Sequence, residues 1–256
     1  MPALRLAAAT GPLLLGLAIA LLVFGARSAS APLDLGPLLE GTALTAGIAL
    51  LVSLPIGLLS AIWIHELAPA DERRLLAPLT TLLGALPGIT VAVFASTTLL
   101  PFIERHLAPG GLAGAPHVAR VAVGAVLGLL LVPFVASRVE DALDAVPSGV
   151  REAARALGGG ELAVLTQVVL PSARPGLVAT VLLATQRALG ETIVVWLLLG
   201  GDGSVTAKIA ELGLEAASGR REALGLACAL ALGLVAVTLA LHGLAHRLFA
   251  RVRSYA

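Results

Sequence analysis

Two ionisable residues, Arg187 and Glu191, lie in an otherwise almost wholly apolar segment, LVATVLLATQRALGETIVVWLLL. A charge at the bilayer centre costs at least about 2.5–3.5 kcal/mol on insertion scales, so such residues usually line a pathway. An arginine guanidinium is a planar fork of donors that suits oxyanions. On one continuous helix, the four-residue spacing predicts that both side chains share a face. The alternative is that the two charges only neutralise each other or bridge to a neighbouring helix.

The composition indicates what kind of chain carries this pair. Of the 256 residues, 58% are hydrophobic and 13% are charged, against about 45–50% and 25% in soluble domains. A soluble enzyme and a disordered chain are therefore excluded. The net charge of +1 leaves no bulk field to attract a nucleic acid. One cysteine, Cys228, excludes an intrachain disulfide. These features predict a polytopic membrane protein.

The predicted fold is all-α, with six transmembrane helices. Each apolar stretch approaches the roughly 20 residues that a spanning helix needs, and the short fourth one can extend if Arg120 reaches the interface. Within these stretches the only charged residues are Arg187 and Glu191. The spans are predicted at Leu6–Gly25, Thr42–Ile64, Leu79–Leu100, Val121–Ser137, Leu177–Leu199 and Ala223–Leu241.

The first span and the orientation follow from the flanking residues. The small residues Ala29–Ala31 after the first apolar run resemble a cleavable signal, but that run exceeds the usual 7–15 residues, so we expect it to be retained. Basic residues favour both termini in the cytoplasm. We divide the chain into 1–35 (first helix and short periplasmic loop), 36–250 (transmembrane core) and 251–256 (cytoplasmic tail).

Helix breakers and a long cytoplasmic loop interrupt this pattern. The breakers are Pro55 with Gly57, Pro87 with Gly88, and Pro133, and they favour a bundle that encloses a cavity. The loop covers about residues 138–175. We predict a first loop helix with Ser148 as N-cap, Glu152 in its first turn and Gly158–Gly160 at its end. A second helix, Glu161–Val169, is predicted to stop before Pro171.

The loop resembles the EAA loop of ABC-importer permeases. It carries E-A-A, then G after three residues, then an aliphatic residue and L-P, at the spacing of that family. The resemblance implies a coupling helix that docks on a separate ATPase subunit, and a type I importer permease (MetI-like) fold. The residues that it assigns to coupling are Glu152, Ala153, Ala154, Gly158, Leu170 and Pro171.

The string RALGET, residues 187–192, after an EAA loop resembles the phosphate-transport permeases PstC and PstA, and the downstream TAKIAELGLEA is closer to PstC. The resemblance implies phosphate passage at Arg187 and Glu191, with Gly190 and Thr192 in the same pathway. It further implies a bacterial inner-membrane subunit. Its partners would be ATP-binding cassette ATPases, a second permease subunit (the same chain or a different one) and a periplasmic substrate-binding protein.

Other functions remain as alternatives. The same residues suit another oxyanion, such as sulfate, molybdate or a phosphonate, and less well an ATP-independent anion channel, which has no reason to present a docking helix. The chain has no phosphate loop, so we expect no enzyme activity of its own and no bound cofactor; the partner ATPase would use ATP and Mg²⁺. We expect no metal site, because His242 and His246 lack a third ligand.

Overall fold

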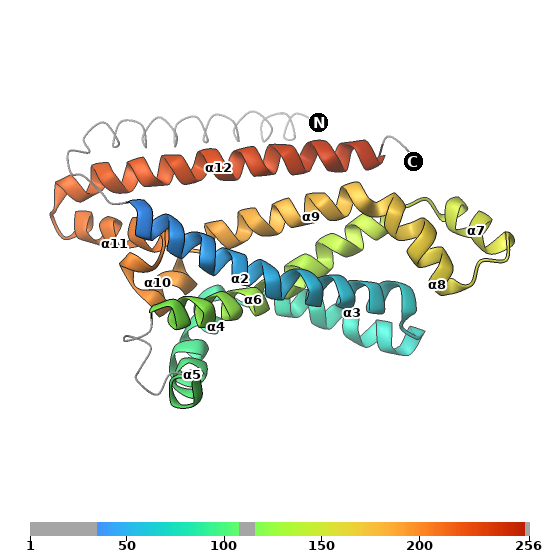
Figure 1. The fold of residues 1–256 in the computed structure, drawn as a ribbon, viewed down its shortest axis with the longest axis horizontal. Coiled ribbons are helices and arrows are strands. Elements are labelled where there is room, and N and C mark those ends of the chain that lie inside the picture. The colour runs from blue at the N-terminus through green and yellow to red at the C-terminus, as the bar shows by residue number, and fades with distance from the viewer. Residues whose placement is uncertain (1–34, 108–115, 254–256) are drawn as a thin grey trace, which may run out of the picture.

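The computed structural model describes residues 35–107 and 116–253, and every regular element in these ranges is helical (Figure 1). This confirms the all-α prediction. Short π-helical turns (η1, η2 and η4) and one 3₁₀ turn (η5) join the α-helices. The elements are α2 (Leu35–Ile62), η1 (Trp63–Leu67), α3 (Ala70–Gly84), α4 (Gly88–Phe94), η2 (Ala95–Leu99), α5 (Leu100–Leu107), α6 (Pro116–Asp144), α7 (Ser148–Ala156), α8 (Glu161–Val164), η4 (Leu165–Val169), α9 (Leu170–Gly190), α10 (Ile193–Leu199), η5 (Gly201–Gly203), α11 (Val205–Ala217) and α12 (Arg221–Arg253).

The described residues contain four helices long and apolar enough to cross a membrane, or five if one bent pair forms a single span. Their positions along the chain correspond to five of the six predicted spans, which supports a multi-pass membrane protein. The first predicted span, Leu6–Gly25, lies outside the described residues. The four helices are Leu35–Leu67, His117–Asp144, Glu161–Gly190 and Glu222–Arg247, and the bent pair is Ala70–Gly84 with Gly88–His106.

The third predicted span, Leu79–Leu100, is broken near its middle. The chain bends by 88° between α3 and α4, at a break that contains Pro87. Proline lacks the N–H of a helical hydrogen bond and disfavours the helical conformation in the residue before it. The prediction of breakers at Pro87 and Gly88 is confirmed, whereas Pro55 and Pro133 lie inside continuous helices.

The fourth span is longer than predicted, because α6 begins at Pro116. Arg120 is therefore helical, and its guanidinium lies 3.9 Å from the Glu40 carboxylate with only 15% of its side chain exposed. The Arg120 charge, which limited the predicted span at its start, is thus paired with Glu40 of α2.

Glycines bring α2 and α6 into close contact. A Cβ built on Gly128 would lie 2.9 Å from the Ala49 carbonyl oxygen, and one on Gly124 would lie 2.8 Å from that of Thr45. On α2, a Cβ built on Gly57 would lie 2.6 Å from a methyl of Val135 of α6. Small residues four apart let membrane helices approach closely. This α2–α6 contact is the centre of the described bundle.

In the described ranges, η1, η2 and η4 each end two residues before a proline. Ala68 N–H donates to the Trp63 carbonyl, five residues back, and Pro69 follows. The same pattern precedes Pro101 and Pro171. A π turn shifts the hydrogen bonding by one residue just where the next residue has no N–H to donate. At Leu100-Pro101 and Leu170-Pro171 the helix therefore continues, whereas at Pro69 it ends because Ala68 has extended backbone angles.

The polar connections gather at the two ends of the long bundle (Figure 1). The α7–α8 segment lies at one end, beside the start of α9, and α10 with α11 lies at the other. Helix α12 runs along α9 between them. The ionisable residues of the fifth predicted span fall where α9 ends.

Candidate functional site

The helix that carries Arg187 ends at Gly190, so the prediction of a shared helical face with Glu191 is wrong. Glu191 has extended backbone angles (φ −74°, ψ 108°), and the chain becomes helical again only at Ile193. The buried Thr206 hydroxyl of α11 donates to the Glu191 carbonyl at 3.2 Å. A broken membrane helix survives where other groups satisfy its freed backbone, as at many transport sites.

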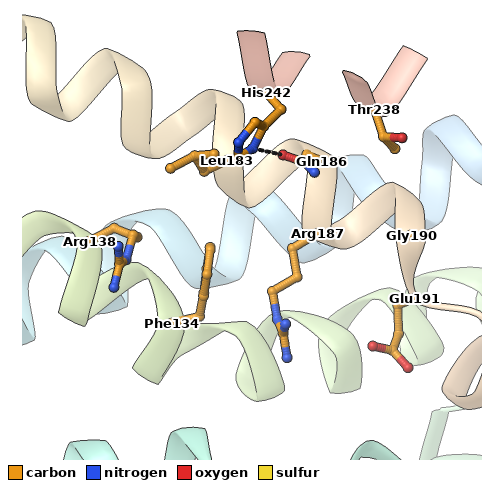
Figure 2. A pocket seen from close by; sticks show the side chains of 9 residues that line it. All are labelled: Phe134, Arg138, Leu183, Gln186, Arg187, Gly190, Glu191, Thr238 and His242. Atoms are coloured by element: carbon orange, nitrogen blue, oxygen red, sulfur yellow. Dashed lines mark hydrogen bonds between the residues drawn. The ribbon is translucent and has the colours of Figure 1, made fainter. Parts of the chain in front are cut away.

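The Arg187 side chain runs from α9 toward α6 and contacts the aromatic ring of Phe134 (Figure 2). The guanidinium carbon lies 5.2 Å from the ring centroid, within the range of a cation–π interaction. Within residues 35–107 and 116–253, neither Arg187 nor Glu191 forms an ion pair, so the alternative in which the two charges only neutralise each other is absent. The guanidinium hydrogen-bond donors of Arg187 are left for another acceptor.

Arg187 lines two neighbouring cavities. The larger, of about 520 Å³, lies between α6, α9 and α12 (Figure 2). The smaller, of about 220 Å³, lies between α3, α6 and α9. The larger is lined by Phe134, Arg138, Leu183, Gln186, Arg187, Gly190, Glu191, Thr238 and His242, and the smaller by Thr80, Thr81, Gly84, Leu130, Pro133, Phe134, Ser137, Glu140 and Arg187.

The Glu191 carboxylate turns toward the break in the third span. A Cβ built on Gly88, the first residue of α4, would lie 3.3 Å from its Oε1. The free N–H groups at a helix start favour a nearby negative charge. The acidic residue of the predicted pair lies beside α4, away from the Arg187 guanidinium.

The structure adds Arg138, at the start of the predicted loop, to the site. Its guanidinium carbon lies 5.9 Å from the Phe134 ring centroid, and it lines the same cavity as Arg187. Its Nη1 also lies 2.9 Å from the exposed Asp141 carboxylate. Phe134 and Arg138 are four residues apart on one helix, a spacing that places them on one face. That spacing was the signal available in the sequence.

The other predicted pathway residues lie at the edge of the site. Gly190 lines the larger cavity, and no atom lies within 4 Å of a Cβ built on it. No close helix approach therefore requires a glycine there. The Thr192 hydroxyl donates to the Gly190 carbonyl at 3.3 Å, across the break. His242 pairs with Gln186 at 3.3 Å (Figure 2). The part of the chain that the structure describes has no cluster of three His, Cys, Asp or Glu side chains.

The predicted coupling segment is the separate helix α7, with two corrections. Pro147, not Ser148, is its N-cap, because Ser148 already has helical geometry and makes no side-chain cap. Glu152 consequently lies beyond the first turn. Gly158, with φ +87°, ends the helix through hydrogen bonds from its own N–H to Arg155 and from Gly159 N–H to Ala154. This is a Schellman motif, which a glycine at positive φ completes at little cost.

The two faces of α7 differ. Glu152 and Ala153 are exposed, whereas Ala154 packs against the apolar cluster formed by α2, α6 and α9. Leu157, at the end of the helix, is 90% exposed. The expected stop before Pro171 is wrong: the helix continues from Glu161 to Gly190 through η4, and Leu170 and Pro171 open α9.

Comparisons with known proteins agree with this architecture. In solved structures, the fold matches an inward-facing methionine ABC transporter, MetNI (TM-score 0.59, 21% identity, 84% of this chain and 94% of that one). It also matches a bacterial alginate ABC transporter (TM-score 0.58, 18% identity, 85% and 78%). The predicted MetI-like permease fold is confirmed.

Curated relatives are similar over about three fifths of the chain. The phosphate transport system permease protein PstC of Haemophilus influenzae is 34% identical over 174 residues, and that of Mesorhizobium japonicum is 32% identical over 174 residues. The alignments cover 62% of this chain and 55% and 53% of those proteins, so the chain spans about half the length of these relatives. The family model described as binding-protein-dependent transport system inner membrane component matches residues 53–254. The chain therefore belongs to this family of inner-membrane transport components.

Proposed function

We propose that the chain is the permease subunit of an ATP-driven importer of inorganic phosphate. The observation that carries the proposal is the position of Arg187, whose guanidinium lines two cavities and has no carboxylate partner among the described residues. A free guanidinium can donate two parallel hydrogen bonds to one oxyanion. Relatives named as phosphate permeases support phosphate as that anion.

We infer that the proposed pathway lies between subunits. Arg187 is exposed on the single chain, although it lies at the end of an apolar helix. A charge left facing hydrocarbon is costly, so another protein surface should cover it. A second permease subunit, either another copy or a related chain, would close the cavities around Arg187. Glu191 lines the larger of these cavities together with Arg187 and would face the anion pathway from beside α4.

The energy for transport would come from separate ATPase subunits that dock on α7. The exposed face of α7, with Glu152, Ala153 and Leu157, is the proposed contact, and Gly158 sets the geometry of its end. A periplasmic binding protein would deliver the anion at the opposite end, near α10 and α11. Both termini of the chain would lie in the cytoplasm of a bacterial cell.

The test is ATP hydrolysis by the reconstituted complex in nanodiscs with its binding protein. Phosphate, sulfate, molybdate and a phosphonate are compared at equal concentration. We expect phosphate to stimulate hydrolysis and the other three to leave it near the basal rate. Stimulation by one of the other anions in place of phosphate would assign the pathway to that oxyanion. A hydrolysis rate that none of the four anions changes would contradict the coupled-importer assignment.

A further inference from the structure

A partly buried ion pair joins α7 to the bundle. Arg151 Nη1 of α7 donates to both carboxylate oxygens of Glu66, at 2.7 and 2.8 Å, and its Nη2 donates to the Leu143 carbonyl of α6 at 2.7 Å. The two side chains are only 17% and 12% exposed. Hydrogen bonds between charged groups are stronger than neutral ones, and burial removes the competition from water. We call this set of three residues the Arg151 junction.

Neighbouring polar groups add a second link to α6 and a first link to α3. His65 Nε2 lies 2.9 Å from the Asp144 carboxylate at the end of α6. From α3, Arg73 donates to the carbonyls of Ile64 and His65, at 3.0 and 2.5 Å. Glu66 and His65 both belong to the π turn η1, which prolongs α2. The ends of α2 and α6 and the start of α3 are thus tied to one arginine of α7.

A second ion pair on the loop lacks these connections. Arg155 Nη2 lies 3.4 Å from Glu161 Oε1, and the two side chains are 52% and 70% exposed. This pair joins α7 only to the neighbouring α8. Exposed pairs of this kind contribute little to stability. Arg155 and Glu161 therefore form a matched control on the same helix.

We infer that Arg151 and Glu66 are positioning residues that transmit movement of α7 to α2, α3 and α6. The inference rests on the proposed coupling role of α7. When an ATPase closes and shifts α7, the membrane helices can follow only if the contacts between α7 and those helices stay intact. Beside the apolar contact of Ala154, the Arg151 junction is a polar contact from α7 to the ends of α2 and α6, and Arg73 of α3 bonds to the carbonyl of the adjacent His65. Loss of the pair should leave ATPase docking and ATP hydrolysis unchanged but lower the amount of phosphate imported per ATP hydrolysed.

The experiment measures phosphate uptake and ATP hydrolysis in the same proteoliposomes. They contain the full complex with binding protein, and the readout is phosphate imported per ATP hydrolysed. The variants are Glu66→Gln, Arg151→Gln and the double variant, with Glu161→Gln as the control. Glu66→Gln keeps the shape and one acceptor oxygen. We expect it to lower the ratio by roughly tenfold or more, since a hydrogen bond between charged groups is worth about that factor. Glu161→Gln should leave the ratio within about twofold.

The double variant separates transmission from general weakening. Residues that act as one unit give non-additive effects, so Glu66→Gln with Arg151→Gln should match the worse single variant. If Arg151→Gln does not assemble, Arg151→Lys replaces it, because lysine keeps the charge but not the fork. Unchanged uptake per ATP in Glu66→Gln would overturn the inference, and so would additive losses. Failure of the wild-type complex to bind an ATPase or import phosphate would instead contradict the proposed function.

Discussion

Replacement of Arg187 by glutamine tests the anion site itself. Glutamine keeps a polar side chain of moderate length but removes the charge and the fork of donors. Each hydrogen bond to a charged group is worth about 1.5–3 kcal/mol, so loss of two weakens anion binding by roughly 3–6 kcal/mol. This corresponds to a loss of roughly 10²- to 10⁴-fold in affinity. Phosphate uptake at low phosphate concentration should therefore fall to background.

The same substitution should not damage the protein. Loss of the cation–π contact with Phe134 removes about 0.5–2 kcal/mol. Removal of an intramembrane charge spares an insertion cost of about 2.5–3.5 kcal/mol on insertion scales. The variant should thus insert and assemble at least as well as the wild type. A pathway residue is expected to lose uptake without losing insertion or assembly, whereas a structural residue would lose all three.

The assay is the initial rate of radiolabelled phosphate uptake into proteoliposomes at equal amounts of assembled complex. Arg74→Gln is the control, because Arg74 is an exposed arginine of α3 that lines neither cavity at Arg187. Arg187→Lys should keep a small residual rate, since a point charge replaces the fork. Uptake by Arg187→Gln within about twofold of the Arg74→Gln rate would refute the role of Arg187.

Three further predictions concern the packing, the loop and the second arginine. Gly128→Ala should lower the melting temperature of the purified chain by the equivalent of about 1–3 kcal/mol, because its Cβ would press on the Ala49 carbonyl. Gly47→Ala is the control, since no atom lies within 4 Å of a Cβ there. Equal melting temperatures for the two variants would contradict the α2–α6 contact. Gly158→Ala should destabilise the end of α7 by about 1–2 kcal/mol, because the residue has φ +87°, and should reduce co-purification of the ATPase. Gly160→Ala is the control, because its Cβ would be equally free of contacts but its φ is negative. Equal amounts of ATPase pulled down by the two variants would count against the loop geometry. Arg138→Gln should raise the phosphate concentration for half-maximal uptake, and an unchanged concentration dependence would remove Arg138 from the pathway.

The sequence predicted the parts of the site that depend on local composition. A charge in an apolar run identifies Arg187, and proline before glycine identifies the break at Pro87 and Gly88. The end of α9 at Gly190 was not predictable in this way, because a single glycine does not end a helix. The break is held by the Thr206 hydroxyl, which comes from a helix 15 residues further along the chain.

The loop shows the same division between local and distant causes. Its spacing predicted α7 and the turn at Gly158, since a helix followed by glycine has a local cause. The continuation of the helix through Pro171 required the π turn η4, which absorbs the missing N–H. Pairing of Arg151 with Glu66, 85 residues apart, is a tertiary contact that no local pattern indicates.

The most direct measurement is the accumulation of radiolabelled phosphate in proteoliposomes that contain this chain with its ATPase, second permease subunit and binding protein. ATP is supplied to the ATPase side, and unlabelled sulfate is present in excess. We predict that phosphate accumulates above its external concentration only when ATP is hydrolysed, and that sulfate does not compete. Equilibration of phosphate without ATP would indicate a channel and contradict the account, as would competition by sulfate or no phosphate uptake at all.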